Sequence, residues 1–473
     1  METDTVIGAS TGCQAVNSVV TIEVSFMSRA ANIPIETRNR GRIVATRLAI
    51  HPVLQARRIA GRVHTLDSLR YRDFRLLFAT TLLVSAGAWT RVVVVGWLTY
   101  SLTKSPLMTS MALGLDALPL LIVSPFGGML ADMWDRRAIM AVAIGFHAAA
   151  VGGLAAIVST GNVEIWQIFA LIILEGSASA FLSPSYVSIV ASIVPKERLI
   201  NAFALTSLTG NSTRLVFPAI AGVVLAVIGP AAALSMGAAL FVAGGIAVMF
   251  MRVRAGEPEE DTGAPRKAGF GESVAFVRIR PVIVAMMALS LLPLMLLGPF
   301  VTGLLPVYAS EVYNVGPAGL GLLTSSLGAG ATLGIIVLAS FGTIRNQLRV
   351  VIVTLALAGV AMAGFSFSPS MILSLPLLIL LSAAASTSMT LGGAAIQSLT
   401  PSKMRGRVSG IHEMTLGLFP LGTLASGVLA QLFGAPSATL FDAGGMVVVL
   451  SVVAFAYRGI WWRTKVPEAT PIA

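Results

Sequence analysis

The stretch Gly127-Gly128-Met129-Leu130-Ala131-Asp132-Met133-Trp134-Asp135-Arg136-Arg137 decides the fold class, because it is a short charged turn between two long apolar segments. These segments cover 107–131 and 139–158. A helix of about 20 apolar residues crosses the roughly 30 Å of hydrocarbon in a bilayer, so the turn lies at a membrane surface. Adjacent arginines in a short connection are typical of the cytoplasmic side.

The composition of the whole chain indicates the same class. Hydrophobic residues make up 56% of the 473 residues and charged residues 11%, and the mean hydropathy is +0.86. Soluble domains carry about 25% charged residues. The apolar runs are too long for barrel strands and lack their alternation, so we predict an all-α membrane protein.

The apolar segments predict 12 transmembrane helices. They cover 76–100, 107–131, 138–158, 165–190, 203–228, 231–251, 282–309, 318–341, 350–368, 371–397, 408–433 and 436–457. The connections on one side hold 18 Lys and Arg residues, whereas those on the other side hold only Lys104. The positive-inside rule therefore places both termini and the long central connection in the cytoplasm.

The central connection 252–281 divides the helices into two halves of six, over 71–251 and 282–457, followed by a cytoplasmic tail at 458–473. The halves resemble each other. Pro195-Lys196-Glu197-Arg198 precedes the fifth span, and Pro401-Ser402-Lys403-Met404-Arg405 precedes the eleventh, 206 residues later. Many secondary transporters are built from such repeats, with the binding site at their interface.

Residues 1–70 do not fit this scheme, because they contain no apolar run long enough to span a bilayer and are rich in arginine. We predict a basic, disordered cytoplasmic extension, or a start annotated too early with Met27 as the alternative. A basic arm that binds anionic lipid at the membrane surface is the other interpretation.

Ionisable residues inside the spans are candidates for function, because each costs several kcal/mol in a bilayer unless it is paired or hydrated. At 1.5 Å per residue, Asp116 and Glu175 lie about 15 Å inside their helices and Arg214 about 16 Å. These depths are near the midplane, where transporters of this kind bind substrate. Arg91 is predicted nearer the outer third of the first span, where packing or snorkelling is the favoured role.

Glu175 and Arg214 lie at similar depth on consecutive spans, so an ion pair between them is possible. Such a pair either fixes helix packing permanently or changes when Glu175 or Asp116 takes up a proton. A carboxyl group removed from water can bind a proton near neutral pH. The sequence leaves open which of the two does so.

The charged turn predicts a cytoplasmic gate. Asp132 is placed to attract a basic group at the start of the eleventh span, either Arg405 or Arg407, in a latch that holds the halves together. The alternative is that these charges only set topology. The full set of gate candidates is Gly128, Asp132, Arg136, Arg137, Arg405 and Arg407.

Several classes of function are excluded by what the sequence lacks. No lysine follows a glycine, so the core of a phosphate-binding P-loop is absent. The four histidines have no metal-ligand spacing, and Cys13 is the single cysteine, so we expect no metal or other cofactor. No segment is suited to an enzyme site. The net charge of +11 follows from the topology, and no nucleic-acid partner is predicted.

Four stretches resemble the major facilitator superfamily (MFS) of secondary transporters, at 71–78, 97–106, 127–137 and 195–202. The similarity is greatest to the bacterial exporter branch that includes enterobactin and macrolide efflux proteins. It implies the MFS fold, and it implies that Asp132 and Arg136 serve the cytoplasmic gate. The stretch 214–222 resembles the antiporter motif of the fifth span. Phe217 replaces the glycine of that motif, and Met133 replaces a basic residue of the gate motif.

We therefore expect a proton-coupled exporter of a small amphipathic compound, such as a drug or a siderophore-like metabolite, that works by alternating access. It is expected to be a monomer in a bacterial inner membrane, with protons, lipids and the small molecule as its partners. One alternative is a symporter that takes up a nutrient. Another is a sensor or scaffold without transport, suggested by the 1–70 extension.

Overall fold

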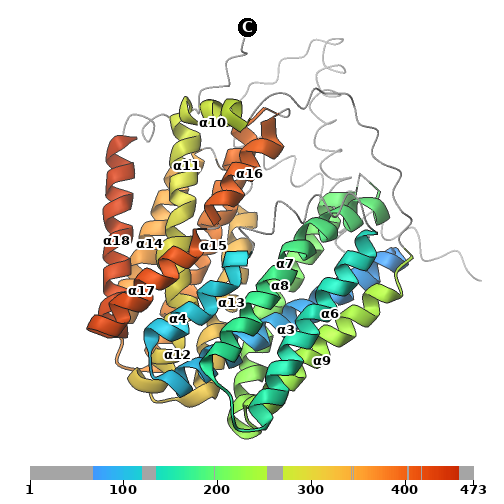
Figure 1. The fold of residues 1–473 in the computed structure, drawn as a ribbon. Coiled ribbons are helices and arrows are strands. Elements are labelled where there is room, and N and C mark those ends of the chain that lie inside the picture. The colour runs from blue at the N-terminus through green and yellow to red at the C-terminus, as the bar shows by residue number, and fades with distance from the viewer. Residues whose placement is uncertain are drawn as a thin grey trace, which may run out of the picture. The chain divides into compact units, whose positions relative to one another are not determined.

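The computed structural model describes residues 68–119, 135–195, 198–252, 270–341, 344, 346–401, 404–416 and 418–457. The chain divides into two compact units, 1–64 and 65–473, and every described residue belongs to the second. The predicted extension therefore lies outside the described residues, apart from 68–70. The described part is helical and contains no strand (Figure 1).

The helices before the central connection are here called the N-terminal helices. They are α3 (Arg72–Thr103), α4 (Pro106–Gly114), the 3-10 turn η2 (Leu115–Ala117), α6 (Arg136–Ser159), α7 (Ile165–Ile193), α8 (Leu199–Val227) and α9 (Pro230–Met249). Their boundaries follow from local sequence. Ser105, just before Pro106, accepts a hydrogen bond from the amide of Met108 at 3.2 Å, and Asp135 accepts one from the amide of Arg137 at 3.0 Å.

The helices after that connection are called the C-terminal helices. They begin with α10 (Phe270–Arg278) and α11 (Pro281–Leu292) and continue through η4 (Pro293–Leu297), η5 (Phe300–Leu304), α12 (Leu305–Val307) and η6 (Tyr308–Val312). The remaining elements are α13 (Gly316–Ser340), α14 (Gln347–Ser366), α15 (Met371–Leu399), α16 (Arg405–Leu416), α17 (Phe419–Phe433) and α18 (Ala435–Ala456).

Within the described ranges, 9 helices are long and apolar enough to cross a membrane, namely α3, α6, α7, α8, α9, α13, α14, α15 and α18. The other three predicted spans are interrupted. The span at 107–131 passes from α4 through η2 into residues outside the description, and the span at 408–433 consists of α16 and α17. The span predicted over 282–309 is helical but irregular, because α11 is followed by three π-helical turns, η4, η5 and η6. Prolines remove the amide donors that a regular helix needs there.

Two hydrophobic clusters form the interior. One is built almost wholly from the N-terminal helices, and Phe74 and Phe241 are fully buried in it. The other comes mainly from the C-terminal helices, and in it Phe300, Tyr308 and Phe365 pack edge to face. Gly229 before α9 and Gly434 before α18, 205 residues apart, both have positive φ, at 110° and 84°. This correspondence agrees with the internal repeat expected from the sequence.

The N-terminal and C-terminal helices meet along two seams, where α4 packs on α17 and α8 packs on α13 (Figure 1). A Cβ atom on Gly427 would lie 2.7 Å from Cβ of Ser110, and one on Gly321 would lie 3.0 Å from Cα of Gly222 and in collision with the carbonyl of Pro218. The backbones therefore touch, as small residues permit in membrane helices. Both seams extend toward the end that the sequence predicts to be the outer one.

Candidate functional site

Arg91 of α3 binds two acidic side chains. Its Nη2 donates a hydrogen bond to Oδ2 of Asp116 at 2.8 Å, and its Nε lies 2.9 Å from Oε1 of Glu175. The N–H of Nε does not point at that oxygen, so this contact is an ion pair without a hydrogen bond. The side chains of Arg91 and Glu175 are 7% and 3% exposed, whereas Asp116 is 30% exposed. Asp116 is thus the member of this group that solvent reaches.

Arg91 lies farther from the predicted outer end of its helix than the predicted span 76–100 implied. The helix does not end at residue 100 but continues to Thr103, where Lys104 adopts a left-handed backbone conformation. Arg91 is therefore about 18 Å from the predicted outer end of α3, near the middle of the bilayer. The guanidinium is buried against two carboxylates, so its contacts fit the packing role and not snorkelling to a surface.

His147 of α6 is a fourth member of the same group. Its Nδ1 lies 2.9 Å from Oε1 of Glu175, its Nε2 lies 3.3 Å from the hydroxyl of Ser179, and its ring stacks on Phe241 with centroids 5.2 Å apart. Neutral imidazole has one donor and one acceptor nitrogen, so it can hydrogen bond on both sides. His147 was not a predicted site residue, because its spacing to the other histidines suits no metal site. Its depth, about 18 Å from the predicted outer end of α6, was the available signal.

We call Arg91, Asp116, His147 and Glu175 the charge network. Each member comes from a different element, α3, η2, α6 and α7, and all lie about 15–18 Å from the predicted outer ends of their helices. Gly176 next to Glu175 allows η2 to approach, since a Cβ there would lie 3.1 Å from the carbonyl carbon of Asp116. Nη1 of Arg91 and Oδ1 of Asp116 are buried without a hydrogen-bond partner among the described residues. Of these two atoms only Oδ1 of Asp116 can accept a proton, since the guanidinium has donors alone.

Arg214 of α8 does not join this network, so the predicted Glu175–Arg214 pair is wrong. Its guanidinium carbon lies 5.0 Å from the ring centre of Trp89, and its Nε is buried with no hydrogen-bond partner in the described part of the chain. The reason is topological. Consecutive spans need not be neighbours along their length, and here α7 packs mainly on α6 while α8 packs on α3 and α13. Arg91 of α3 thus binds Glu175, which was expected to pair with Arg214 because their spans are consecutive in the sequence.

Arg214 lines a cavity of about 190 Å³ where N-terminal and C-terminal helices meet. Trp89 of α3 and Arg214 of α8 form one wall. The other wall comes from the region of η4 and from α15, with the residues Pro293, Leu294, Leu297, Gly298, Ser382, Ala385, Ser386 and Met389. No acidic side chain lines this cavity in the described structure.

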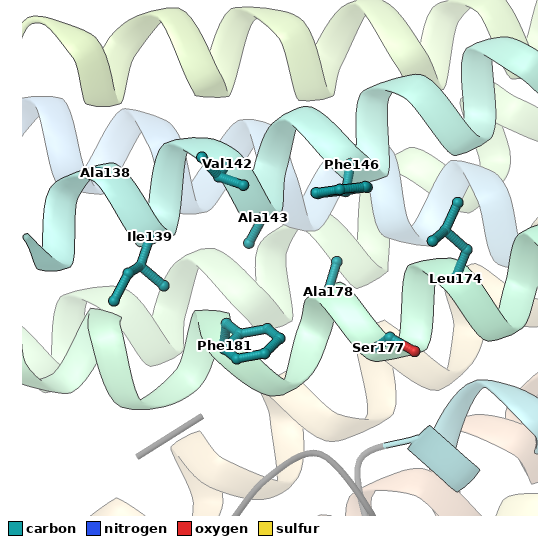
Figure 2. A pocket seen from close by; sticks show the side chains of 9 residues that line it. All are labelled: Ala138, Ile139, Val142, Ala143, Phe146, Leu174, Ser177, Ala178 and Phe181. Carbon is teal, nitrogen blue, oxygen red and sulfur yellow. The ribbon is translucent and has the colours of Figure 1, made fainter. Parts of the chain in front are cut away.

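A larger pocket of about 310 Å³ lies between α6 and α7, but its chemistry does not suit a polar site (Figure 2). Figure 2 shows that its side chains are aliphatic or aromatic apart from the hydroxyl of Ser177. Val142, Phe146 and Leu174 are also exposed on the surface of these helices. We interpret it as a groove on the apolar surface of the bundle, distinct from the candidate site.

The predicted gate is described only in part. Gly128 and Asp132 lie outside the described residues, as does the side chain of Arg407. Arg137 donates from Nη2 to the carbonyl of Met249 at the end of α9, a favourable place for a cation. Arg405 donates from Nε to the carbonyl of Thr400 at 3.1 Å. Arg136 starts α6, and no described contact tests the latch, which stays a prediction.

Comparison with known proteins identifies the family. A sequence profile of the transmembrane secretion effector family of the MFS matches residues 63–465. The chain belongs to the major facilitator superfamily. The fold agrees, since an inward-facing, unoccupied bacterial homologue of the human lysosomal transporter Spinster superposes with a TM-score of 0.67. That superposition covers 84% of this MFS chain and 99% of the homologue at 14% identity, so it bears on the fold alone.

Two efflux proteins among the relatives indicate the branch of the MFS. The multidrug efflux pump Tap of Mycobacterium tuberculosis (strain ATCC 25618 / H37Rv) is 25% identical over 380 residues, which are 78% of this chain and 89% of Tap. Macrolide efflux protein A of Streptococcus pyogenes is 22% identical over 299 residues, 62% of this chain and 73% of that protein. The uncharacterised MFS-type transporter YfiS of Bacillus subtilis (strain 168) is 25% identical over 214 residues, 44% of this chain and about half, 49%, of YfiS. This protein is an MFS transporter of the efflux branch.

Proposed function

We propose that this transporter exports small amphipathic molecules in exchange for protons, and that the charge network carries the proton. The observation that supports this is two acids, Asp116 and Glu175, sharing Arg91 at mid-bilayer depth, with His147 on the more buried acid. Ionisable groups inside a membrane protein are costly and mark ion pathways. Arg91, and not Arg214, is thus the cation whose pairing with Glu175 and Asp116 would change when one of these acids takes up a proton.

The charges of the network favour the uptake of one proton. With both acids ionised, Arg91 protonated and His147 neutral, the network has a net charge of −1. An uncompensated charge inside a protein costs several kcal/mol, so a state with one added proton is stabilised. Asp116 is the most exposed member of the network, which suits it to receive the proton first. Glu175 and His147, which are more buried than Asp116, then share this proton.

Alternating access requires two bodies that move against each other. We propose that the 9 long helices and the three interrupted spans make two halves of six, with both termini in the cytoplasm of a monomer in a bacterial inner membrane. The close α4–α17 and α8–α13 seams support a state closed at the predicted outer end. Export is favoured over uptake by the efflux relatives.

The proposal is tested with the purified full chain in proteoliposomes. The probes are ethidium, a cation, Nile red, a neutral dye, and 8-anilinonaphthalene-1-sulfonate, an anion. We expect an acid interior to drive accumulation of at least one dye. Glu175→Gln and Asp116→Asn should each lower this flux at least tenfold, since neither amide binds a proton, while exchange of dye without a pH gradient persists.

Asp442 provides the matched control for these variants. It is a buried carboxylate of the C-terminal helices, 4% exposed, and it accepts a hydrogen bond from Ser426 at 2.6 Å. Asp442→Asn should keep the response to the pH gradient. The proposal fails if no dye responds to the gradient in the unmodified protein, or if both network variants respond normally. Inverted vesicles separate export from symport, because a symporter would move dye and protons in the same direction.

A further inference from the structure

Arg214 is a cation without a compensating acid in the described structure. Its Nε is fully buried and unpaired, and the ring of Trp89, 5.0 Å from the guanidinium carbon, is its one described electrostatic partner. A cation–π contact offsets only a small part of the free-energy cost of leaving a charge unpaired inside a protein. The contact with Trp89 therefore leaves most of the cost of this cation uncompensated.

The part of Arg214 that is not covered by protein faces the cavity between the N-terminal and C-terminal helices. Ser386 on the opposite wall has a hydroxyl with no described partner, whereas the hydroxyl of Ser382 is used in a 2.6 Å bond to the carbonyl of Leu327. The remaining walls are aliphatic, with Met389 as an adaptable side chain. A molecule in the cavity thus meets one cation, one free hydroxyl, an indole ring and apolar surface.

We infer that this cavity is a subsite for an amphipathic organic anion, with its carboxylate or comparable acidic group on Arg214 and a ring or flat apolar body between Trp89 and Met389. Guanidinium groups bind carboxylates through paired, charge-assisted hydrogen bonds. A bound anion removes the unfavourable charge, so it binds more tightly than a neutral molecule of the same shape. A cation in the same place would be repelled.

The location links this subsite to transport. Its walls come from α3 and α8 on one side and from the η4 region and α15 on the other, so a bound anion contacts both sets of helices. The inference names the substrate class of the proposed function. It rests on that function in so far as the cavity is a transport site.

The test measures binding and does not depend on flux. The purified full chain in detergent is titrated at pH 7 with three ligands that share one ring body: 2-naphthoate, 2-naphthalenemethanol and 2-naphthylmethylammonium. Isothermal calorimetry gives each dissociation constant. We expect 2-naphthoate to bind at least tenfold more tightly than either other ligand, which corresponds to about 1.4 kcal/mol.

Variants assign the preference to Arg214. Arg214→Met should bring the three ligands to within threefold of one another, whereas Arg214→Lys, which keeps the charge, should retain an anion preference. Arg349→Met is the control, because Arg349 is an exposed arginine at the start of α14. It should bind 2-naphthoate as the unmodified chain does. If Arg214→Met does not fold, the test uses Arg214→Lys and Trp89→Leu instead. Trp89→Leu removes the ring wall and should weaken the binding of all three ligands.

Two results would overturn the inference: equal binding of the ammonium and the carboxylate by the unmodified chain, or an anion preference that survives in folded Arg214→Met. The outcome is separable from that of the proposed function. Selective 2-naphthoate binding together with dye flux that ignores the pH gradient would contradict proton coupling and support the subsite. Dye flux driven by the pH gradient without selective 2-naphthoate binding would support proton coupling and contradict the subsite.

Discussion

Arg91 and Arg214 lie at similar depth in the N-terminal helices, yet their surroundings give them different chemistry. Arg91 holds two carboxylates within 2.9 Å, so its charge is balanced by groups that can themselves bind protons. Arg214 has an aromatic ring and an open cavity. A buried pair that contains a proton acceptor suits coupling, and a buried cation without an acid suits recognition of an anion. The two proposals thus use separate residues and are tested separately.

His147 gives the sharpest prediction at the residue scale. His147→Gln keeps a side chain that can hydrogen bond to Glu175 but cannot bind a proton near neutral pH. We expect dye flux driven by the pH gradient to fall at least tenfold and its pH profile to change, because the amide does not carry a proton. Exchange of dye without a gradient should persist. The measurement is flux in proteoliposomes at a series of pH values.

Ser179→Ala is the control for His147, because it removes only the weaker 3.3 Å contact of the imidazole and leaves its proton site intact. Its pH profile should follow that of the unmodified chain. If the pH profile of His147→Gln also matches that of the unmodified chain, the imidazole takes no part in coupling. Its role is then structural, through stacking on Phe241.

At the scale of elements, the seams between helices depend on positions without side chains. At the α8–α13 seam, a Cβ on Gly222 would lie 2.6 Å from the carbonyl of Pro317, and one on Gly321 would lie 3.2 Å from Cα of Ala219. Ala219 also forms a hydrogen bond across the seam, since its amide donates to the hydroxyl of Ser325 at 2.9 Å. The seam is therefore fixed by backbone contact and leaves little room for change.

Gly321→Ala tests this seam. The added methyl group must displace one helix from the other, and overpacking of this kind costs about 1–3 kcal/mol. We expect a lower thermal unfolding temperature in detergent, followed by tryptophan fluorescence. Gly210→Ala on α8 is the matched control, because a Cβ there meets nothing within 4 Å, and it should unfold at or above the temperature of the unmodified chain. Equal unfolding temperatures for the two variants would contradict a close seam.

At the scale of the whole molecule, transport requires the predicted outer end to open. Ser105 at the start of α4 donates a hydrogen bond to Oε1 of Gln431 of α17 at 2.7 Å, which ties the N-terminal and C-terminal helices together at that end. The pair Ser105→Cys and Gln431→Cys, made after Cys13→Ser, can be joined by a short bifunctional methanethiosulfonate reagent. We expect the cross-link to abolish most dye flux and a reductant to restore it.

The two single cysteine variants are the controls, and the same reagent should leave their flux unchanged. Undiminished flux through the cross-linked protein would mean that the outer end does not separate during transport. That result would contradict alternating access by two moving halves, whatever the fate of the charge network.

The sequence by itself determined the membrane class, the positions of most spans and the family. These depend on composition, run length and a charged turn such as 127–137, all of which are local properties of the chain. It also identified Asp116, Glu175, Arg91 and Arg214 as candidates, because an ionisable residue in an apolar run is visible without any fold.

Only the tertiary structure decided which of these residues meet. Packing of α3, η2, α6 and α7 brought Arg91 and His147 to Glu175, and packing of α8 on α3 and α13 left Arg214 beside Trp89. Depth along a helix follows from counting residues, but the neighbour across a bundle depends on which helices are adjacent and on the face each one turns inward. That is why the candidates were found from the sequence while their partners were not.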